Sequence, residues 1–282
     1  MRNFKQVIFL LGIFLLLLNI YGLFKTLRNP EIYTERNTWF LSDITLKYPE
    51  IKNEFIRREN ESDKDFAIRA NKNVHDGILH YWEDEGLAKY HLTVPPWDNY
   101  LLYVARYIDP KIYRKYEFSN YKKNLERGIG LCSTHSIILK GILNNNGIDA
   151  DLLDLRHHVV LRTKLDKNEW WILDPDYGVV VPFDTAAVRA DPKIILTSYK
   201  DMNSLYKPEI KEHYTPKYLA ELYGGDGNRI YSVDNWFEYF SYWAIWIIPF
   251  LLMLPYYIQL FRRNKYNISD YAQNNHITST VT

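Results

Sequence analysis

Two long apolar segments without charged residues, one near each end of the chain, constrain its fold most. Residues 7–24 read VIFLLGIFLLLLNIYGLF, and residues 240–261 read FSYWAIWIIPFLLMLPYYIQLF. A helix of about 20 apolar residues is long enough to cross the hydrocarbon core of a bilayer. No small-residue cleavage motif follows the first segment, so it reads as an uncleaved anchor rather than a signal peptide. The sequence therefore predicts two transmembrane helices.

Basic residues after the second segment predict how the chain is oriented in the membrane. Arg262, Arg263 and Lys265 follow it directly, and basic residues are concentrated on the cytoplasmic side of membrane helices. The first segment carries similar basic charge before and after it. Because two spans bring both tails to the same side, we expect both termini in the cytoplasm and the intervening domain on the extracytoplasmic side.

Between the anchors the chain has room for one domain. We expect a tail and transmembrane helix over 1–29, a domain over 30–234, a second transmembrane helix over 235–262 and a disordered polar tail over 263–282. A mean hydropathy of −0.34 excludes a polytopic transporter, and a net charge of +1 without a basic stripe argues against nucleic acid as a partner. The single cysteine, Cys132, excludes an internal disulfide framework.

The first half of the domain has the pattern of helices. Ser62 and Asp65 resemble a capping box. Apolar residues then recur at helical spacing: Phe66, Ala70, Val74, Ile78 and Tyr81. A second helix is predicted over 132–146, ended by Gly147 as its C-cap.

The second half has the pattern of strands. Short apolar, β-branched and aromatic runs occupy residues 150–155, 158–164, 169–173 and 179–181, with a turn at 166–168. Helices followed by antiparallel strands predict an α+β fold.

Cys132 is the first candidate for chemistry. It follows the flexible run Gly-Ile-Gly-Leu and begins the predicted helix over 132–146. The positive end of a helix and its unpaired amides favour a thiolate and can hold an oxyanion. The alternative is a buried cysteine that packs as a small apolar residue.

His158 and Asp174 are the candidate partners of this thiol. A thiol nucleophile needs a histidine to take its proton and a third group to orient that histidine. An odd-length turn centred on Asp166 would place His158 directly opposite Asp174 on one face of a hairpin, with His157 on the other face. A turn of even length would break this match.

These residues stand in a recognisable order. Gly-Leu-Cys-Ser at 130–133 is followed by Asn-Gly-Ile-Asp-Ala at 146–150, His-Val-Val-Leu at 158–161 and Trp-Trp-Ile-Leu-Asp-Pro-Asp-Tyr-Gly at 170–178. Over these roughly fifty residues the chain resembles the transglutaminase-like superfamily, as a membrane-anchored, bacterial-type member.

The resemblance implies a papain-related core in which Cys132 is the nucleophile, His158 the general base and acid, and Asp174 the orienting carboxylate. Papain-type enzymes carry a glutamine upstream of the cysteine as an oxyanion donor. Glu126 and Arg127 occupy that stretch here, so the second donor is not identified.

The remaining histidines and tryptophans have simpler interpretations. A zinc site formed by Cys132, His135, His157 and His158 matches no ligand spacing, and we predict no metal and no cofactor. His135 is expected to make an ordinary polar contact on its helix. Four histidines show no partner pattern and are expected at the surface or at caps: His75, His80, His91 and His213. Trp170 and Trp171 either wall the site or pack across the hairpin.

The sequence thus favours a membrane-anchored thiol enzyme at the cell surface. It would form an acyl-enzyme on amide bonds of a protein or peptide, as a peptidase or amidase or in transglutaminase-type acyl transfer. The alternative is a non-catalytic transglutaminase-like scaffold or binding module in a membrane assembly that processes a surface polymer or protein. A redox thiol is a weaker third reading, because the chain has no resolving cysteine.

Overall fold

The structure is a computed structural model that describes residues 2–35, 39–41, 43–48, 50–165, 169–225 and 229–278. Its internal contacts divide the chain into two units. A helical unit comprises Met1–Lys25, Val94–Ile108 and Trp236–Thr282, and an α+β unit comprises Thr26–Thr93 and Asp109–Asn235.

The centre of the α+β unit is an antiparallel five-stranded sheet. The strands lie in the order β6 (Val179–Val181), β5 (Glu169–Asp174), β4 (Val159–Leu165), β3 (Ala150–Asp154) and β7 (Arg229–Tyr231). The four predicted strands are confirmed, within one or two residues at their ends. The edge strand β7 was not predicted, since its three residues, Arg-Ile-Tyr, lack the run of valines that marks the equally short β6.

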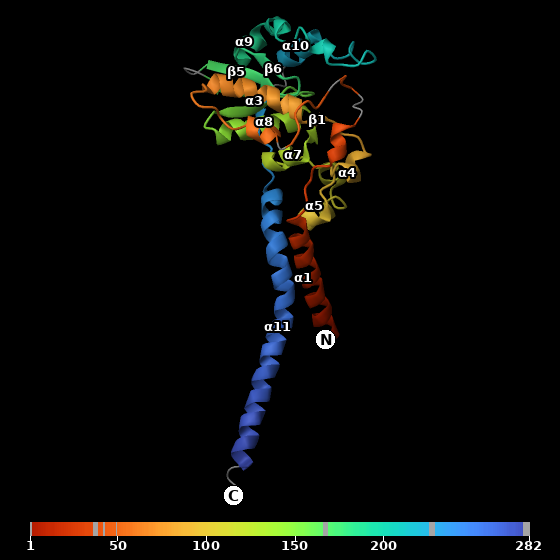
Figure 1. Cartoon of the computed structure of the whole chain (residues 1–282), viewed down its shortest axis with the longest axis vertical. Helices are drawn as coiled ribbons and strands as arrows, with labels where there is room; N and C mark the ends of the chain where they lie inside the picture. Colours follow the sequence, from red (N-terminus) through yellow and green to blue (C-terminus); the bar gives the residue numbers. More distant parts are fainter. Residues whose placement is uncertain are drawn as a thin grey trace. The chain divides into compact units, whose positions relative to one another are not determined.

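Helices cover both faces of this sheet, as Figure 1 shows for α3 (Asp63–Gly77) and α8 (Cys132–Asn145) on one side. Leu161 and Leu173 pack in the core beneath these two helices. The alternate residues Val160 and Ile172 pack in a second core, because successive side chains of a strand point to opposite faces. That second core is covered by α9 (Thr185–Ala190), η2 (Pro192–Thr197) and α10 (Pro216–Gly224). The predicted α+β class is confirmed.

The ends of α3 and α8 follow from local sequence. Ser62 caps α3 by accepting from the amide of Asp65, and α3 ends at Gly77, so Tyr81 of the predicted stripe lies beyond the helix. Gly147 has a φ of +76°, and the amide of Ile148 donates to the carbonyl of Leu143, as in a glycine C-cap.

Short elements complete the unit. A parallel two-residue ladder joins β1 (Leu79–His80) to β2 (Ile129–Gly130), and β2 leads directly into α8. The other short elements are η1 (Pro30–Tyr33), α2 (Glu50–Glu54), α4 (Gly86–Lys89), α6 (Pro110–Tyr113), α7 (Tyr121–Arg127) and η3 (Met202–Ser204).

The register of the β4–β5 hairpin differs from the prediction by two residues. Leu161 pairs with Leu173 and Leu165 with Glu169, so position 158 is level with position 176 rather than with Asp174. The predicted turn at 166–168 lies outside the described residues. Since a shift of two residues preserves the face of each side chain, His158 and Asp174 still share one face.

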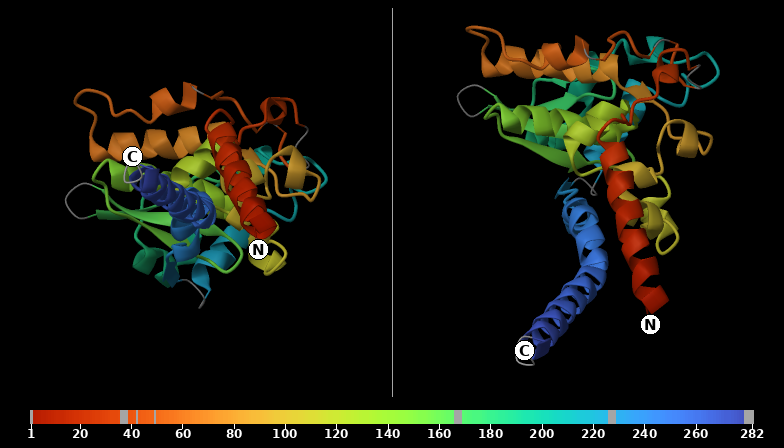
Figure 2. Two further views of the ribbon diagram at one scale, coloured as in Figure 1. Left: turned by 90° about the horizontal axis from the view of Figure 1, so that it is seen from below. Right: turned by 60° about the horizontal axis from the view of Figure 1, so that its bottom comes forward.

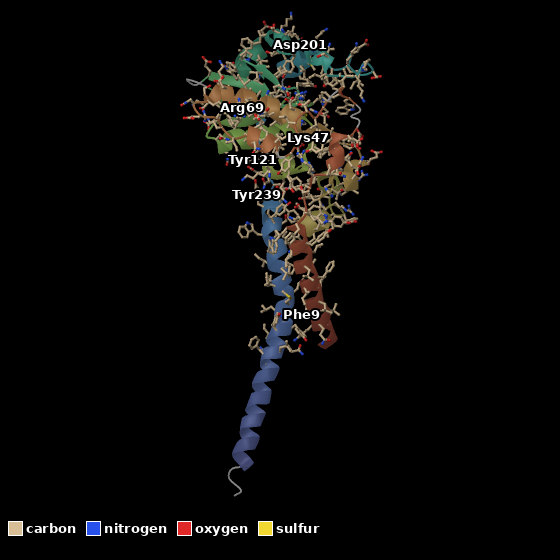
Figure 3. The ribbon with its side chains drawn as sticks, viewed as in Figure 1. Phe9, Lys47, Arg69, Tyr121, Asp201 and Tyr239 are labelled. Atoms are coloured by element: carbon tan, nitrogen blue, oxygen red, sulfur yellow. The ribbon has the colours of Figure 1, made fainter. Side chains whose placement is uncertain are left out.

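The helical unit contains α1 (Arg2–Gly22), α5 (Pro96–Ala105) and α11 (Trp236–Thr278). Phe4–Gly22 and Trp236–Arg262 are long and apolar enough to cross a membrane. α1 and α11 lie side by side (Figures 1 and 2), and the Phe9 ring of α1 (Figure 3) packs 4.6 Å from the ring of Tyr256.

α11 is longer than the predicted span. It continues through Pro249 and Pro255 and ends at Thr278, and Figure 2 shows that it bends along its length. The described part of the tail, predicted to be disordered, is therefore helical in its backbone.

Candidate active site

Cys132 is the first residue of α8, as the sequence predicts, and it is partly exposed. The preceding Gly130 fits closely against this helix, because a Cβ there would lie only 2.2 Å from the Cβ of Thr134. One turn after Cys132, the hydroxyl of Ser136 donates to the carbonyl of Val159 at 2.8 Å. This bond fastens the start of α8 to the chain next to His158.

His158 is positioned by a tight turn between β3 and β4. Arg156 in this turn has a φ of +72°, and the amide of Leu155 donates to the carbonyl of His158 at 2.8 Å. The His158 ring is buried, and its Nε2 lies 2.7 Å from Oδ2 of Asp174. Nε2 is thereby committed to the carboxylate, which leaves Nδ1 as the nitrogen able to exchange a proton with Cys132.

Asp174 is buried and receives three hydrogen bonds. Besides His158, the hydroxyl of Tyr199 donates to Oδ2 at 2.7 Å. The amide of Asp176 donates to Oδ1 at 3.1 Å. Tyr199 comes from the layer of helices beyond the sheet and is itself fully buried. Three donors hold this carboxylate in one orientation.

The charges of these groups act on one another. Burial disfavours the charged ring, but the negative charge and hydrogen bond of Asp174, together with the contact with Cys132, raise the pKa of His158 well above its usual value. The arrangement therefore places a histidine whose pKa is raised, and which a carboxylate orients, next to the candidate nucleophilic sulfur.

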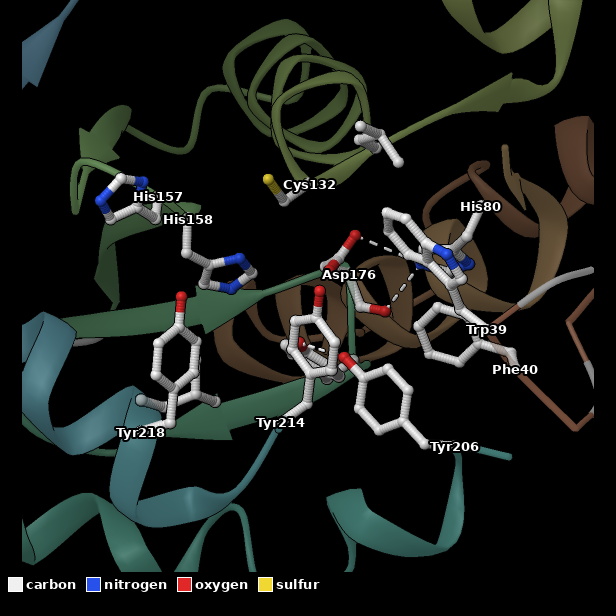
Figure 4. A pocket seen from close by; sticks show the side chains of 13 residues that line it. Trp39, Phe40, His80, Cys132, His157, His158, Asp176, Tyr206, Tyr214 and Tyr218 are labelled. Carbon is white, nitrogen blue, oxygen red and sulfur yellow. Dashed lines mark hydrogen bonds and ion pairs between the residues drawn. The ribbon is translucent and has the colours of Figure 1, made fainter. Parts of the chain in front are cut away.

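Cys132 and His158 open into a common pocket of about 620 Å³, its open mouth included. Figure 4 shows the His158 ring beneath Cys132, with tyrosines on the opposite wall, whereas exposed His157 lies to one side. The lining is mainly aromatic and is formed by Trp39, Phe40, His80, Leu131, Cys132, His157, His158, Asp176, Tyr177, Tyr206, Tyr214, Tyr218 and Leu219.

His80 was expected at the surface or a cap, and this prediction is wrong. It is buried at the end of β1. Its Nδ1 lies 2.6 Å from Oδ1 of Asp43, and its Nε2 donates to the carbonyl of Asp176 at 2.9 Å. His75 of α3 donates to the same carbonyl at 2.8 Å. Two histidines thus fix the turn that follows Asp174.

The histidines around Asp176 differ in charge. Burial opposes ionisation of both His80 and Asp176, but Asp43 and Asp176 raise the pKa of His80 well above its usual value, and His80 lowers the pKa of Asp176. Burial, and then the charge of His80, lower the pKa of His135 to about 4. The cluster therefore contains a cationic His80 next to a neutral His135.

This cluster is the part of the described chain that comes nearest to a metal site. His80, His135 and Asp176 offer ligand atoms within 4.8 Å of one another. However, the rings of His80 and His135 stack at 4.2 Å, so their lone pairs run parallel rather than converge. His135 Nδ1 lies 2.8 Å from the carbonyl of Leu131, the ordinary helix contact expected for it. The geometry favours a structural hydrogen-bond network.

The four-residue zinc set considered from the sequence does not form such a group. Among the described residues, the ligand atoms that lie this close together come from His80, His135 and Asp176, without Cys132, His157 or His158.

Glu117 is a further residue that the sequence did not single out. Its Oε1 accepts from the hydroxyl of Ser133 at 2.7 Å and from that of Thr134. Burial raises the pKa of Glu117 in spite of these bonds. Glu117 therefore braces the first turn of α8 directly after Cys132.

Four residues near the predicted site lie outside the pocket lining. Trp170 lies against Arg162 and Trp171 against Lys64, so the packing interpretation of this tryptophan pair holds. Glu126 accepts from the amide of Leu27, and Arg127 is fully buried.

Three tyrosines of the pocket come from a tyrosine-rich segment that composition alone reveals. Five tyrosines occur between positions 199 and 223, at 199, 206, 214, 218 and 223, and those at 206, 214 and 218 line the pocket. Such density in a segment without strong periodicity is a signal of an aromatic wall, although it does not say what the wall faces.

No protein-family model, no curated protein and no solved structure matches this chain.

Proposed function

We propose that this protein is a membrane-anchored thiol enzyme that forms an acyl-enzyme at Cys132 from an amide substrate. The observation that carries the proposal is that Cys132 and His158 line one pocket, while Asp174 holds the far nitrogen of the His158 ring at 2.7 Å. The same arrangement supports the resemblance to the transglutaminase-like superfamily.

The reaction follows from the roles of these atoms. The Cys132 sulfur, having given its proton to Nδ1 of His158, attacks the carbonyl carbon of the amide. Amides in the first turn of α8 stabilise the oxyanion. The carbon–nitrogen bond then breaks, His158 gives its proton to the leaving amine, and a thioester remains on Cys132. Water or a second amine attacks the thioester and restores the thiol.

Asp174 orients the His158 ring and stabilises its charged form, as the third group of a triad does. Tyr199 and the amide of Asp176 in turn hold Asp174. The pocket above the sulfur is walled by aromatic side chains, which suits a peptide segment that buries apolar surface as it binds.

The acyl-enzyme can be tested with p-nitrophenyl acetate on the full chain in detergent micelles. We expect a burst of nitrophenolate and an acetyl group on Cys132, found by mass spectrometry of the intact chain and its peptides. Adding a primary amine such as methylamine then separates the two fates, since the acetyl group passes to water or to the amine.

Two matched variants sharpen the test. His158→Gln should slow acylation near neutral pH by on the order of 100-fold, the usual contribution of a general base, whereas His157→Gln, altered at the neighbouring exposed histidine, should not. Equal acylation of wild type and His158→Gln would contradict the proposal. Absence of acetyl-Cys132 would favour the non-catalytic scaffold.

A further inference from the structure

The segment Val94–Ile108, which contains α5, exposes an apolar surface. Val104 is 51 % exposed, Tyr107 68 % and Ile108 82 %. These three are the exposed residues of this fully described segment, so its exposed positions are all apolar or aromatic. Exposed apolar residues grouped in this way, on a segment that contacts two long apolar helices, mark an interaction site.

The same segment packs against the end of α1. A Cβ on Gly22, the last residue of α1, would lie 1.9 Å from the carbonyl oxygen of Trp97. The backbone of α5 therefore touches the backbone of α1 at the point where the apolar stretch Phe4–Gly22 ends.

α5 also packs along the beginning of α11 through buried polar contacts. Asn99 donates to the hydroxyl of Ser241 at 2.7 Å, and the hydroxyl of Tyr100 donates to the carbonyl of Ile245 at 3.1 Å. Ile245 lies nine residues after Trp236, the first residue of α11, which corresponds to about 13 Å along the helix. α5 is thus level with the end of one span and the first turns of the other.

That level is where a bilayer changes from hydrocarbon to headgroups. The hydrocarbon core is about 30 Å thick, and about 40–45 Å includes the headgroup regions. Aromatic and basic side chains are enriched at this depth. At the end of α5, the guanidinium of Arg106 lies 4.0 Å from the centre of the Tyr103 ring and 4.6 Å from that of Tyr107. This segment therefore supplies both aromatic and basic side chains.

From these observations we propose that Val104, Tyr107 and Ile108 insert into the headgroup and upper acyl region of the bilayer, on the side where α1 ends and α11 begins. The chain is then anchored in the membrane by two spanning helices and by a third element that lies at the interface. The occupant of this surface is lipid, because the surface is continuous with the two apolar helices that α5 contacts. This inference goes beyond the proposed enzyme and does not depend on it.

The test places a fluorophore at this surface. In a Cys132→Ser background the chain has no other cysteine, so Ile108→Cys can be labelled alone with an environment-sensitive dye. The full chain is reconstituted in phosphatidylcholine–phosphatidylglycerol vesicles that carry a spin label on the headgroup or near the middle of the acyl chain. We expect blue-shifted emission that is quenched most strongly by the headgroup label.

The matched control is Ile56→Cys, an isoleucine of the α+β unit that is 66 % exposed. Its dye should emit as in water and show no quenching by lipid labels. The proposal is overturned if Ile108 behaves like Ile56. It is also overturned if the Ile108 dye is blue-shifted without lipid quenching, which would indicate contact between copies of the chain, or if the mid-chain label quenches more strongly than the headgroup label.

Discussion

At the scale of single residues, the hydrogen bonds that hold Asp174 in place also determine how the His158 ring is oriented. Its Oδ2 faces both His158 and Tyr199 at 2.7 Å, and its Oδ1 accepts from the amide of Asp176. Because the whole carboxylate is buried, each lost donor leaves a buried oxygen with fewer hydrogen bonds, which costs stability. The hydroxyl of Tyr199 is the donor that can be removed with the least change in shape.

We predict that Tyr199→Phe lowers the free energy of unfolding by about 1.5–3 kcal/mol, the range for a hydrogen bond to a charged group. Thermal unfolding of the full chain in detergent measures this loss. The effect should largely vanish in an Asp174→Asn background, because the hydroxyl then has no charged partner. An equal loss in both backgrounds would show that Tyr199 acts through its other contact, with Tyr223.

His80 and His135, stacked on each other, make opposite contributions to the pH dependence of stability. The raised pKa of His80 gives stability that is present below about pH 6.5 and is lost as the pH rises through its folded value. The pKa of His135 is lowered to about 4, so its contribution is present above about pH 6.5 and is lost as the pH falls toward 4.

We therefore predict that His135→Gln reduces the loss of stability on acidification between pH 6.5 and pH 4, by as much as about 3 kcal/mol. The measurement is thermal unfolding of the full chain across this pH range. His213→Gln, which alters an exposed histidine, should leave the wild-type slope in place. A His135→Gln variant with the wild-type slope would contradict the assignment of a neutral buried imidazole.

The sequence predicted some residues of the site but not others for a physical reason. Cys132, His158 and Asp174 carry recognisable chemistry next to a helix start and two strands. Tyr199 and Asp43 reach the site from irregular segments, 25 and 37 residues away from the partners they contact. No local periodicity encodes such contacts, because the fold of the whole unit brings them together.

At the scale of elements, a proline in α11 explains how three helices are joined. Pro249 has no amide hydrogen, so the carbonyl of Ile245 loses its partner within the helix. That carbonyl accepts instead from the side-chain amide of Asn19 at 2.6 Å and from the hydroxyl of Tyr100. Prolines are tolerated in membrane helices when neighbouring helices satisfy the freed carbonyl in this way.

We predict that Asn19→Ala destabilises the helical unit by about 1 kcal/mol, in the range for a hydrogen bond between membrane helices. Unfolding in sodium dodecyl sulfate followed by circular dichroism gives the value. In a Pro249→Ala background the amide of residue 249 can donate to the carbonyl of Ile245. Because that carbonyl then has a partner within the helix, the free-energy cost of Asn19→Ala should fall. The same cost in both backgrounds would refute this account of the proline.

The β4–β5 hairpin shows which features of a strand pair the sequence pattern predicts and which it does not. Alternation of side chains correctly placed His158 and Asp174 on one face. The pairing itself was wrong by two residues, since Leu161 pairs with Leu173. Alternation gives the two faces of each strand, whereas the length and geometry of the turn set the register, and with it which residues of the two strands share a face. Residue types alone did not determine that turn here.

At the scale of the whole molecule, the sequence predicts that the α+β unit lies on the extracytoplasmic side of the membrane. The proposed topology depends on basic residues flanking the spans, and Arg28 is no longer one of them. It is buried and donates to the carbonyls of Glu126 and Leu125. With Arg28 taken up inside the α+β unit, Arg2 and Lys5 outweigh Lys25, which favours a cytoplasmic N-terminus.

The lone cysteine makes this topology testable in intact cells. Cys132 is partly exposed and lines the pocket, so a membrane-impermeant maleimide should label it without lysis if the α+β unit is extracytoplasmic. Cys132→Ser gives the background, and Thr282→Cys in that variant, at the end of the tail, should be labelled only after permeabilisation. Labelling of Cys132 only after permeabilisation would place the unit in the cytoplasm. In that case the basic residues after the second apolar segment would not have determined the topology, and substrates at the cell surface would be excluded.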